Sequence, residues 1–168
     1  MPSATPPLTL DAAEALIYEA KTWDEAVPEL AWKKLSTKGF PEAYYSYNRL
    51  HPEDEHSHEL AVECYYKPSI LQGLPAALSL SLTYNHQRLL GVDSGMAGSH
   101  LNKSLHLPED ERLVGHPHLH RPAPGMLKDF AEALPASELA DLWEDFLLLA
   151  NLLEAPELDL PAAGDRLL

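Results

Sequence analysis

The spacing of hydrophobic residues changes twice along the chain, and each spacing predicts a different kind of element. Leu10, Ala13, Ile17 and Ala20 recur at the helical period, and Thr9 is a suitable N-cap, so we expect an amphipathic helix up to about Trp23. A second short helix is expected within residues 24–35, ahead of a break near residues 39–41.

Strict alternation replaces the helical period in the middle of the chain. Apolar residues alternate over 60–66, and the stretch 78–84 alternates Leu with Ser and Thr, which is typical of half-buried strands. Asn85 and His86 suit a hairpin turn into a return strand over 88–93, and residues 44–49 are a candidate earlier strand. These segments together predict an antiparallel meander.

The helical period returns over residues 137–153, where Leu139, Leu142, Phe146, Leu149 and Leu153 share one face and acids occupy the other. Further leucines widen that face, so this helix is either enclosed in the core or offers a surface for self-association or a protein partner. The predicted fold is therefore α+β, a four- to five-stranded antiparallel meander with N- and C-terminal helices packed on one face. We expect a loose tail over 1–7, one domain over 8–155 and a C-terminal tail over 156–168.

Length and composition narrow the class of protein. The 168 residues are 45% hydrophobic, which is enough for one globular core. The single cysteine, Cys64, excludes an internal disulfide and a cysteine-based zinc site. No apolar run approaches the ~20 residues of a membrane span, and the N-terminus lacks secretory features, so we expect a soluble cytoplasmic protein with no membrane association.

Charge is distributed unevenly along the chain. The net charge of −14 disfavours general binding of DNA or RNA. Residues 129–168 contribute −9 of it, ten acids against Arg166, whereas residues 84–128 are near neutral and hold six of the nine histidines. A small anion or a short RNA substrate is therefore still compatible with the histidine-rich segment.

Three histidines at alternating positions, His116, His118 and His120, form the most specific feature of the chain. In an extended strand they would project from one face. Imidazole exchanges protons near neutral pH and is the commonest metal ligand in proteins, so this pattern suits acid–base chemistry or metal binding. A structural alternative is that the imidazoles lie on a polar sheet face and hydrogen-bond to a neighbouring loop.

Two chemical hypotheses follow from these histidines. His118 and His120 with His100 would make a three-histidine site for a divalent metal such as zinc, to which Asp93 is the only carboxylate that obviously converges. Alternatively, His118 and His120 would act as base and acid in metal-independent cleavage of RNA, with a cation supplied by Arg121, Lys103 or Arg88. His51, His56 and His58 lie among acids and are interpreted as part of a solvated loop.

Short motifs connect the chain with two families. The strand end Leu-Leu-Gly-Val-Asp-Ser-Gly over 89–95, the loop 100–102 and the segment Pro-His-Leu-His over 117–120 resemble a family of small, functionally uncharacterised bacterial and phage proteins, similar to toxin-like proteins of toxin–antitoxin and defence loci. The resemblance spans roughly residues 8–153 and implies site residues His100, Asn102, His118 and His120, in an endoribonuclease or an accessory protein. His116 lies outside the family pattern, and Ser99 and Arg121-Pro122 depart from it.

His-Pro-His-Leu-His over 116–120 is also similar to the signature of histidine-triad nucleotide hydrolases. That resemblance implies His118 as nucleophile with His116 and His120 in support, but the residues on both sides of the motif do not fit. The sequence thus leaves four functions open: a toxin-like or defence-associated endoribonuclease, a divalent-metal-binding protein, a noncatalytic interaction protein that uses its acidic C-terminal helix, and a nucleotide hydrolase.

Overall fold

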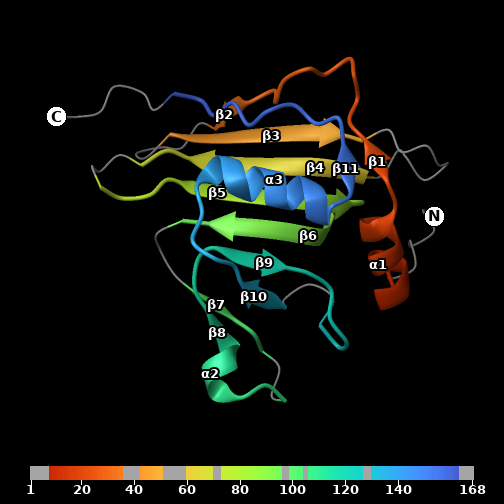
Figure 1. The fold of residues 1–168 in the computed structure, drawn as a ribbon, viewed down its shortest axis with the longest axis vertical. Helices are drawn as coiled ribbons and strands as arrows, with labels where there is room; N and C mark the ends of the chain where they lie inside the picture. Colours follow the sequence, from red (N-terminus) through yellow and green to blue (C-terminus); the bar gives the residue numbers. More distant parts are fainter. Residues whose placement is uncertain are drawn as a thin grey trace, which may run out of the picture.

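A computed structural model of the protein describes residues 8–35, 42–50, 60–69, 73–95, 99–103, 106–126 and 130–162. The fold is mixed α and β, built around a seven-stranded antiparallel sheet in the order β10-β9-β6-β5-β4-β3-β2 (Figure 1). Its strands are β2 (Lys33–Leu35), β3 (Ala43–Arg49), β4 (Leu60–Lys67), β5 (Ala77–Tyr84), β6 (Gln87–Ser94), β9 (His118–His120) and β10 (Ala131–Ala133). The expected four to five strands were an undercount, because β2 and β10, of three residues each, are too short to show an alternating pattern.

The helices and two small strand pairs surround this sheet. The helices are α1 (Leu10–Tyr18), α2 (Glu109–Arg112) and α3 (Leu139–Leu149). Strand β1 (Lys21–Thr22) pairs in parallel with β11 (Leu152–Leu153), and β7 (His100–Leu101) pairs with β8 (Leu113–Val114). The β7–α2–β8 segment projects from the end of the sheet where β9 and β10 lie.

The long central strands confirm the alternation in the sequence. Strands β4, β5 and β6 contain the predicted segments 60–66, 78–84 and 88–93. The β5–β6 hairpin turns at Asn85 and His86, whose φ angles of 48° and 62° match the left-handed conformation that tight hairpins need.

The predicted helices were too long at the ends where the chain enters the small β1–β11 pair. Thr9 caps α1 as expected, but the helix ends at Tyr18 rather than near Trp23, and β2 lies where a second helix was expected. The C-terminal helix ends at Leu149, because Asn151 takes a positive φ of 49° and the next residues pair with β1. Long-range strand pairing therefore replaced the last helical turn at both places.

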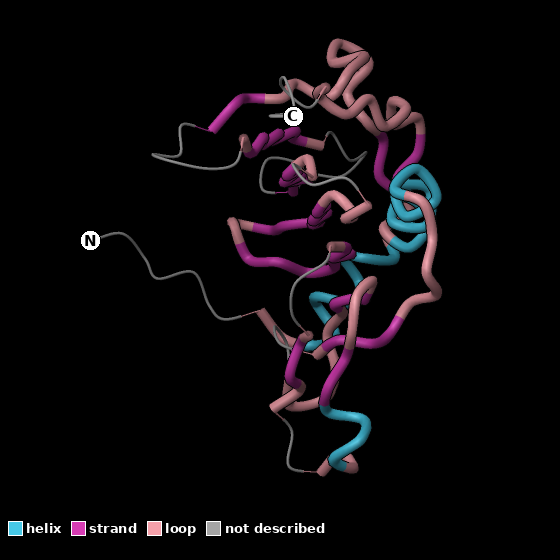
Figure 2. Tube along the Cα trace, turned by 90° about the vertical axis from the view of Figure 1, so that its left-hand side faces the viewer, coloured by secondary structure: helices cyan, strands magenta, loops and turns pink. Residues whose placement is uncertain are grey.

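The two faces of the sheet differ sharply in character. One face is apolar, with Val62, Leu80, Leu82 and Val92 in a buried cluster that also contains the inner face of α3 and residues of α1. Seen edge-on, α3 lies against one side of the sheet, and among the described residues no helix covers the opposite side (Figure 2). The predicted mixture of helices and an antiparallel sheet is confirmed, and both terminal helices contribute residues to the core cluster.

The chain after α3 is anchored to the body by indole groups. Trp143 Nε1 donates to the carbonyl of Pro156 at 2.9 Å, and Trp32 Nε1 donates to that of Asp159 at 2.7 Å. Leu158 and Leu160 pack against the core cluster. Of the expected tail, residues 156–162 are therefore docked on the domain. In the described ranges, no helix has the length and apolarity needed to span a membrane.

Candidate metal centre

The register of the central strands aligns polar side chains in rows across the face of the sheet that lies opposite α3, which we call the open face. Ser79 pairs with Asp93, and Asp93 pairs with His118 on the next strand. In the neighbouring row Ser81 pairs with Gly91, and Gly91 pairs with His120. Because paired residues of adjacent strands point to the same side, this register brings Asp93 together with His118 and His120.

A β-bulge places a cation in the same group. Leu82 pairs with Leu90, but the next residue, Thr83, pairs with Arg88, so Leu89 is an extra residue on β6. Such a bulge shifts the side-chain alternation by one position. Arg88 would otherwise point into the apolar core with Leu90. The bulge turns it to the open face, where Asp93 lies.

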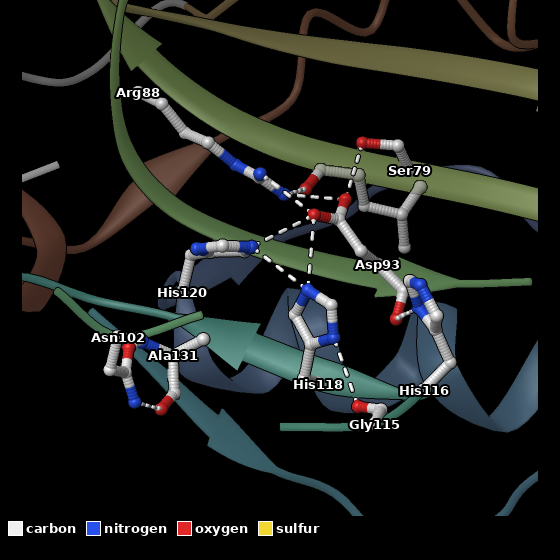
Figure 3. A network of polar contacts seen from close by, with 10 residues as sticks. Ser79, Arg88, Asp93, Asn102, Gly115, His116, His118, His120 and Ala131 are labelled. Atoms are coloured by element: carbon white, nitrogen blue, oxygen red, sulfur yellow. Dashed lines mark hydrogen bonds and ion pairs between the residues drawn. The ribbon is translucent and has the colours of Figure 1, made fainter. Parts of the chain in front are cut away.

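Asp93 is the centre of this polar network (Figure 3). Arg88 donates to both carboxylate oxygens, at 2.8 and 3.0 Å, and Ser79 Oγ donates to Oδ1 at 2.6 Å. Oδ2 lies 2.9 Å from His120 Nε2 and 3.6 Å from His118 Nε2. Burial raises the pKa of Asp93, but the contacts with His118, His120 and Arg88 outweigh burial and hold that pKa well below its ordinary value. Asp93 is therefore a carboxylate anion at neutral pH.

The two histidines of β9 face each other with their Nε2 atoms 3.0 Å apart. His118 Nδ1 lies 3.0 Å from the carbonyl of Gly115, so Nδ1 is the nitrogen that donates, and in the neutral ring Nε2 keeps its lone pair. Burial is the largest influence on His120 and lowers its pKa, against the opposing effect of Asp93. His120 Nδ1 is buried without a hydrogen-bond partner among the described residues. The two rings therefore turn one nitrogen each toward the same point, from which both could contact one ion.

His100 reaches the same group from β7, outside the main sheet. Its ring centroid lies 4.7 Å from that of His120 and 5.7 Å from that of His118. One ring nitrogen from each of His100, His118 and His120 lies within 4.8 Å of the other two. The three-histidine set expected from the sequence is therefore brought together in space.

The other residues proposed from the sequence take different places. His116 lies just before β9, with its ring 4.6 Å from that of His118 and Nδ1 3.4 Å from the Asp93 carbonyl. The buried Asn102 side chain exchanges two hydrogen bonds of 2.8 Å with the backbone of Ala131, which indicates a structural role. Arg121 pairs with Glu132 on β10 instead of with the histidines, and Lys103 is exposed. His51, His56 and His58 lie outside the described residues.

Sequence reasoning missed the contributions of Ser79 and Gly91. Ser79 belongs to the alternating polar positions of β5, which were interpreted only as the solvent side of a strand. A Cβ on Gly91 would lie 1.9 to 2.2 Å from guanidinium atoms of Arg88, so the glycine provides the space in which Arg88 reaches Asp93. A glycine inside the apolar strand pattern, between Leu90 and Val92, was the available signal for such a close approach.

We expect Gly91→Ala to lower the free energy of unfolding by about 1–2 kcal/mol, because the added methyl group displaces Arg88 from its bidentate contact with Asp93. Urea denaturation measures this change. Gly115→Ala is the matched control, since nothing lies within 4 Å of its Cβ position, and it should change stability by less than about 0.5 kcal/mol. Equal effects of the two substitutions would contradict the role given to Gly91.

Comparison of the chain with known proteins finds no matching family model, no matching curated protein and no matching solved structure.

Proposed function

We propose that the protein binds one divalent transition-metal ion through His100, His118 and His120, with Asp93 beside the site. The observation that carries this proposal is the convergence of three imidazole nitrogens within 4.8 Å. Imidazole donors favour zinc and its neighbours in the first transition row, whereas magnesium and calcium prefer oxygen donors. Zinc is therefore the metal we expect to bind most readily among physiological ions.

The distances within the group support a shared ion. Ligand atoms 2.0 to 2.2 Å from a tetrahedral zinc ion lie about 3.3 to 3.6 Å apart. The separations among His118 Nε2, His120 Nε2 and Asp93 Oδ2 are 3.0, 2.9 and 3.6 Å. Small side-chain rotations would thus bring these atoms to coordination distances without any change in the sheet.

Supporting contacts resemble those that orient metal ligands in proteins. A ligating histidine usually donates its second ring nitrogen to a carbonyl or carboxylate, which fixes the orientation of the ring. The carbonyl of Gly115 holds His118 in this way. Asp93, which Arg88 and Ser79 hold, contacts Nε2 of His120, the nitrogen that faces the proposed ion, so this carboxylate lies beside the ion position and does not orient the ring through its second nitrogen. These partners would prepare the site before a metal arrives.

The same geometry gives less support to a metal-independent ribonuclease. A base and an acid that cleave a phosphodiester must leave room for the phosphate between them. His118 and His120 touch through Nε2 and are 3% and 8% exposed, so they leave no such space in this conformation. A bound metal would supply a Lewis acid and an activated water, so hydrolysis of a phosphodiester remains a compatible activity for the site.

The test is metal titration of the purified protein, followed by calorimetry and elemental analysis. The wild-type chain should take up one equivalent of zinc and ignore magnesium at the same concentration. His118→Ala combined with His120→Ala removes two of three ligands, so zinc affinity should fall by more than about 100-fold. Cobalt(II) added in place of zinc should give an absorption spectrum typical of tetrahedral coordination, and the double variant should lack it.

His86→Asn is the matched control, because His86 lies in the exposed β5–β6 turn and asparagine tolerates its positive φ. This variant should bind zinc like the wild type. Failure of the wild type to bind zinc at micromolar concentration, or unchanged binding by the double variant, would refute the metal centre.

A further inference from the structure

The open face of the sheet also gathers aromatic side chains that the sequence distributes over two strands. Tyr45 and Tyr65 are cross-strand partners, and Tyr47 follows on the same face of β3. Tyr47 and Tyr65 are 38% and 39% exposed, so part of each ring is accessible to a ligand. Tyr45 donates its hydroxyl hydrogen to Glu63, which holds the phenol against the sheet.

Cations surround these rings although the chain as a whole is strongly acidic. Strand alternation and register place four cationic residues on this face, namely Lys33, Arg49, Lys67 and Arg88. Among the described strand residues that the register places on this face, Glu63 and Asp93 are the acids, so the formal charge of this set is four minus two, or +2. The whole chain carries −14. The described strand residues of this face thus carry a net positive charge, although the chain as a whole is acidic.

The aromatic surface is continuous with the histidines. One cross-strand row runs from Lys33 through Tyr45, Tyr65, Ser79 and Asp93 to His118. With about 4.8 Å between neighbouring strands, Tyr65 lies ~14 Å from His118 along this row. An elongated ligand that stacks on the tyrosines would therefore extend to the histidine cluster.

We propose that this tyrosine face, defined by Tyr45, Tyr47, Tyr65, Lys33, Arg49 and Lys67, binds a single-stranded nucleic acid. Exposed aromatic rings on a sheet stack unpaired bases, and nearby cations contact the phosphates. The positive local charge favours this occupant over a neutral glycan, which would gain nothing from the lysines and arginines. This inference goes beyond the metal centre and does not rest on it, because stacking and phosphate contacts need no metal.

The test is fluorescence anisotropy with a labelled 12-nucleotide oligouridylate in the presence of chelator, which removes any contribution of a metal. We expect binding at low salt that weakens as salt rises, with a slope of about −2 in log K against log salt for three phosphate contacts. A duplex of the same length should bind more weakly, because its bases cannot stack on the tyrosines. A labelled oligothymidylate distinguishes RNA from DNA as the preferred strand.

Two pairs of variants isolate the two kinds of contact. Tyr47→Ser with Tyr65→Ser should weaken binding about 10-fold or more, whereas Tyr18→Ser, at a 70% exposed tyrosine on α1, should leave binding unchanged. Lys33→Gln with Arg49→Gln should make the salt slope shallower. Lys34→Gln should not, because Lys34 points to the other side of β2 and pairs with Glu42.

Absence of binding to both oligonucleotides at low salt would overturn the proposal. Binding that survives the tyrosine pair of substitutions would also overturn it, as would a preference for an uncharged oligosaccharide such as cellohexaose. The glutamine variants keep the proposal testable if the tyrosine variants fail to fold, since Lys33 and Arg49 are exposed. Zinc titration of the same samples reports separately on the metal centre.

Discussion

Asp93→Asn is expected to lower the free energy of unfolding by about 2–4 kcal/mol in urea denaturation with chelator present. Asparagine keeps the size of the side chain but removes the charge that Arg88 and Ser79 contact. Loss of one partner from a fully buried ion pair costs roughly 3–5 kcal/mol, and we reduce this because the two side chains remain 20% and 26% exposed. The expected loss is largely the cost of leaving the Arg88 guanidinium without its counter-charge.

A double-mutant cycle tests that explanation. Arg88→Met removes the cation, so the Asp93→Asn substitution should cost less in the Arg88→Met background than in the wild type. We expect a coupling energy of about 1–3 kcal/mol between the two positions. Additivity within about 0.5 kcal/mol would show that Asp93 stabilises the fold through the histidines or Ser79 and not through Arg88.

Lys21→Met is the second substitution with a large expected effect, a loss of about 2–4 kcal/mol in the free energy of unfolding. Lys21 is fully buried. Its Nζ donates to the backbone carbonyls of Ile17 at 2.9 Å and Ala150 at 2.8 Å, and also to the backbone carbonyl of Glu19. These carbonyls lie at the C-terminal ends of α1 and α3, where helices leave acceptors unsatisfied and the helix dipole favours a cation. Methionine fills the space but leaves the acceptors unpaired, at a cost of about 1–3 kcal/mol for each buried group.

The pH dependence of stability provides a second measurement on the same variant. Burial is the largest influence on Lys21 and lowers its pKa from 10.5 to about 8, against the charge of Glu19. Between these values the unfolded chain binds more protons than the folded one, so the free energy of unfolding contributed by Lys21 rises as pH increases from about 8 to 10.5. This rise should disappear in Lys21→Met and persist in Lys103→Met, at an exposed position. A Lys21→Met variant with wild-type stability and an unchanged pH profile would contradict the role of this lysine.

The long central strands and the hydrophobic face of α3 were predictable because their information is local. In β5 every second residue is buried against the core, so alternation over eight residues was sufficient to predict the strand. The turn at Asn85 and His86 was predictable for the same reason. A strand through the alternating histidines was also expected, but its restriction to His118–His120 and its place between β6 and β10 follow from long-range pairing.

The histidines of the candidate site could be predicted from the sequence, but the residues that hold Asp93 beside them could not. Alternation in residues 116–120 correctly indicated that His118 and His120 share a face, and His100 was correctly grouped with them. No pattern near Arg88 indicates that an extra residue at Leu89 turns it toward Asp93. That bulge becomes visible only when β5 and β6 are aligned residue by residue.

Two further features have no local signature. Lys21 follows an amphipathic helix, and nothing in the neighbouring sequence indicates that it is buried. The carbonyl of Ala150, 129 residues away, helps to hold its ammonium group in the interior. No basic and aromatic stretch is evident in the chain, yet strand register collects three tyrosines and four cations on one face.

Element type, the apolar faces and the identity of the histidines thus follow from the amino-acid order, because burial imposes its period on neighbouring residues. The contacts that each polar side chain makes depend on strand register, on one bulge and on the residue at which each helix ends. Those are set by free-energy differences between alternative long-range pairings, to which many distant residues contribute small amounts.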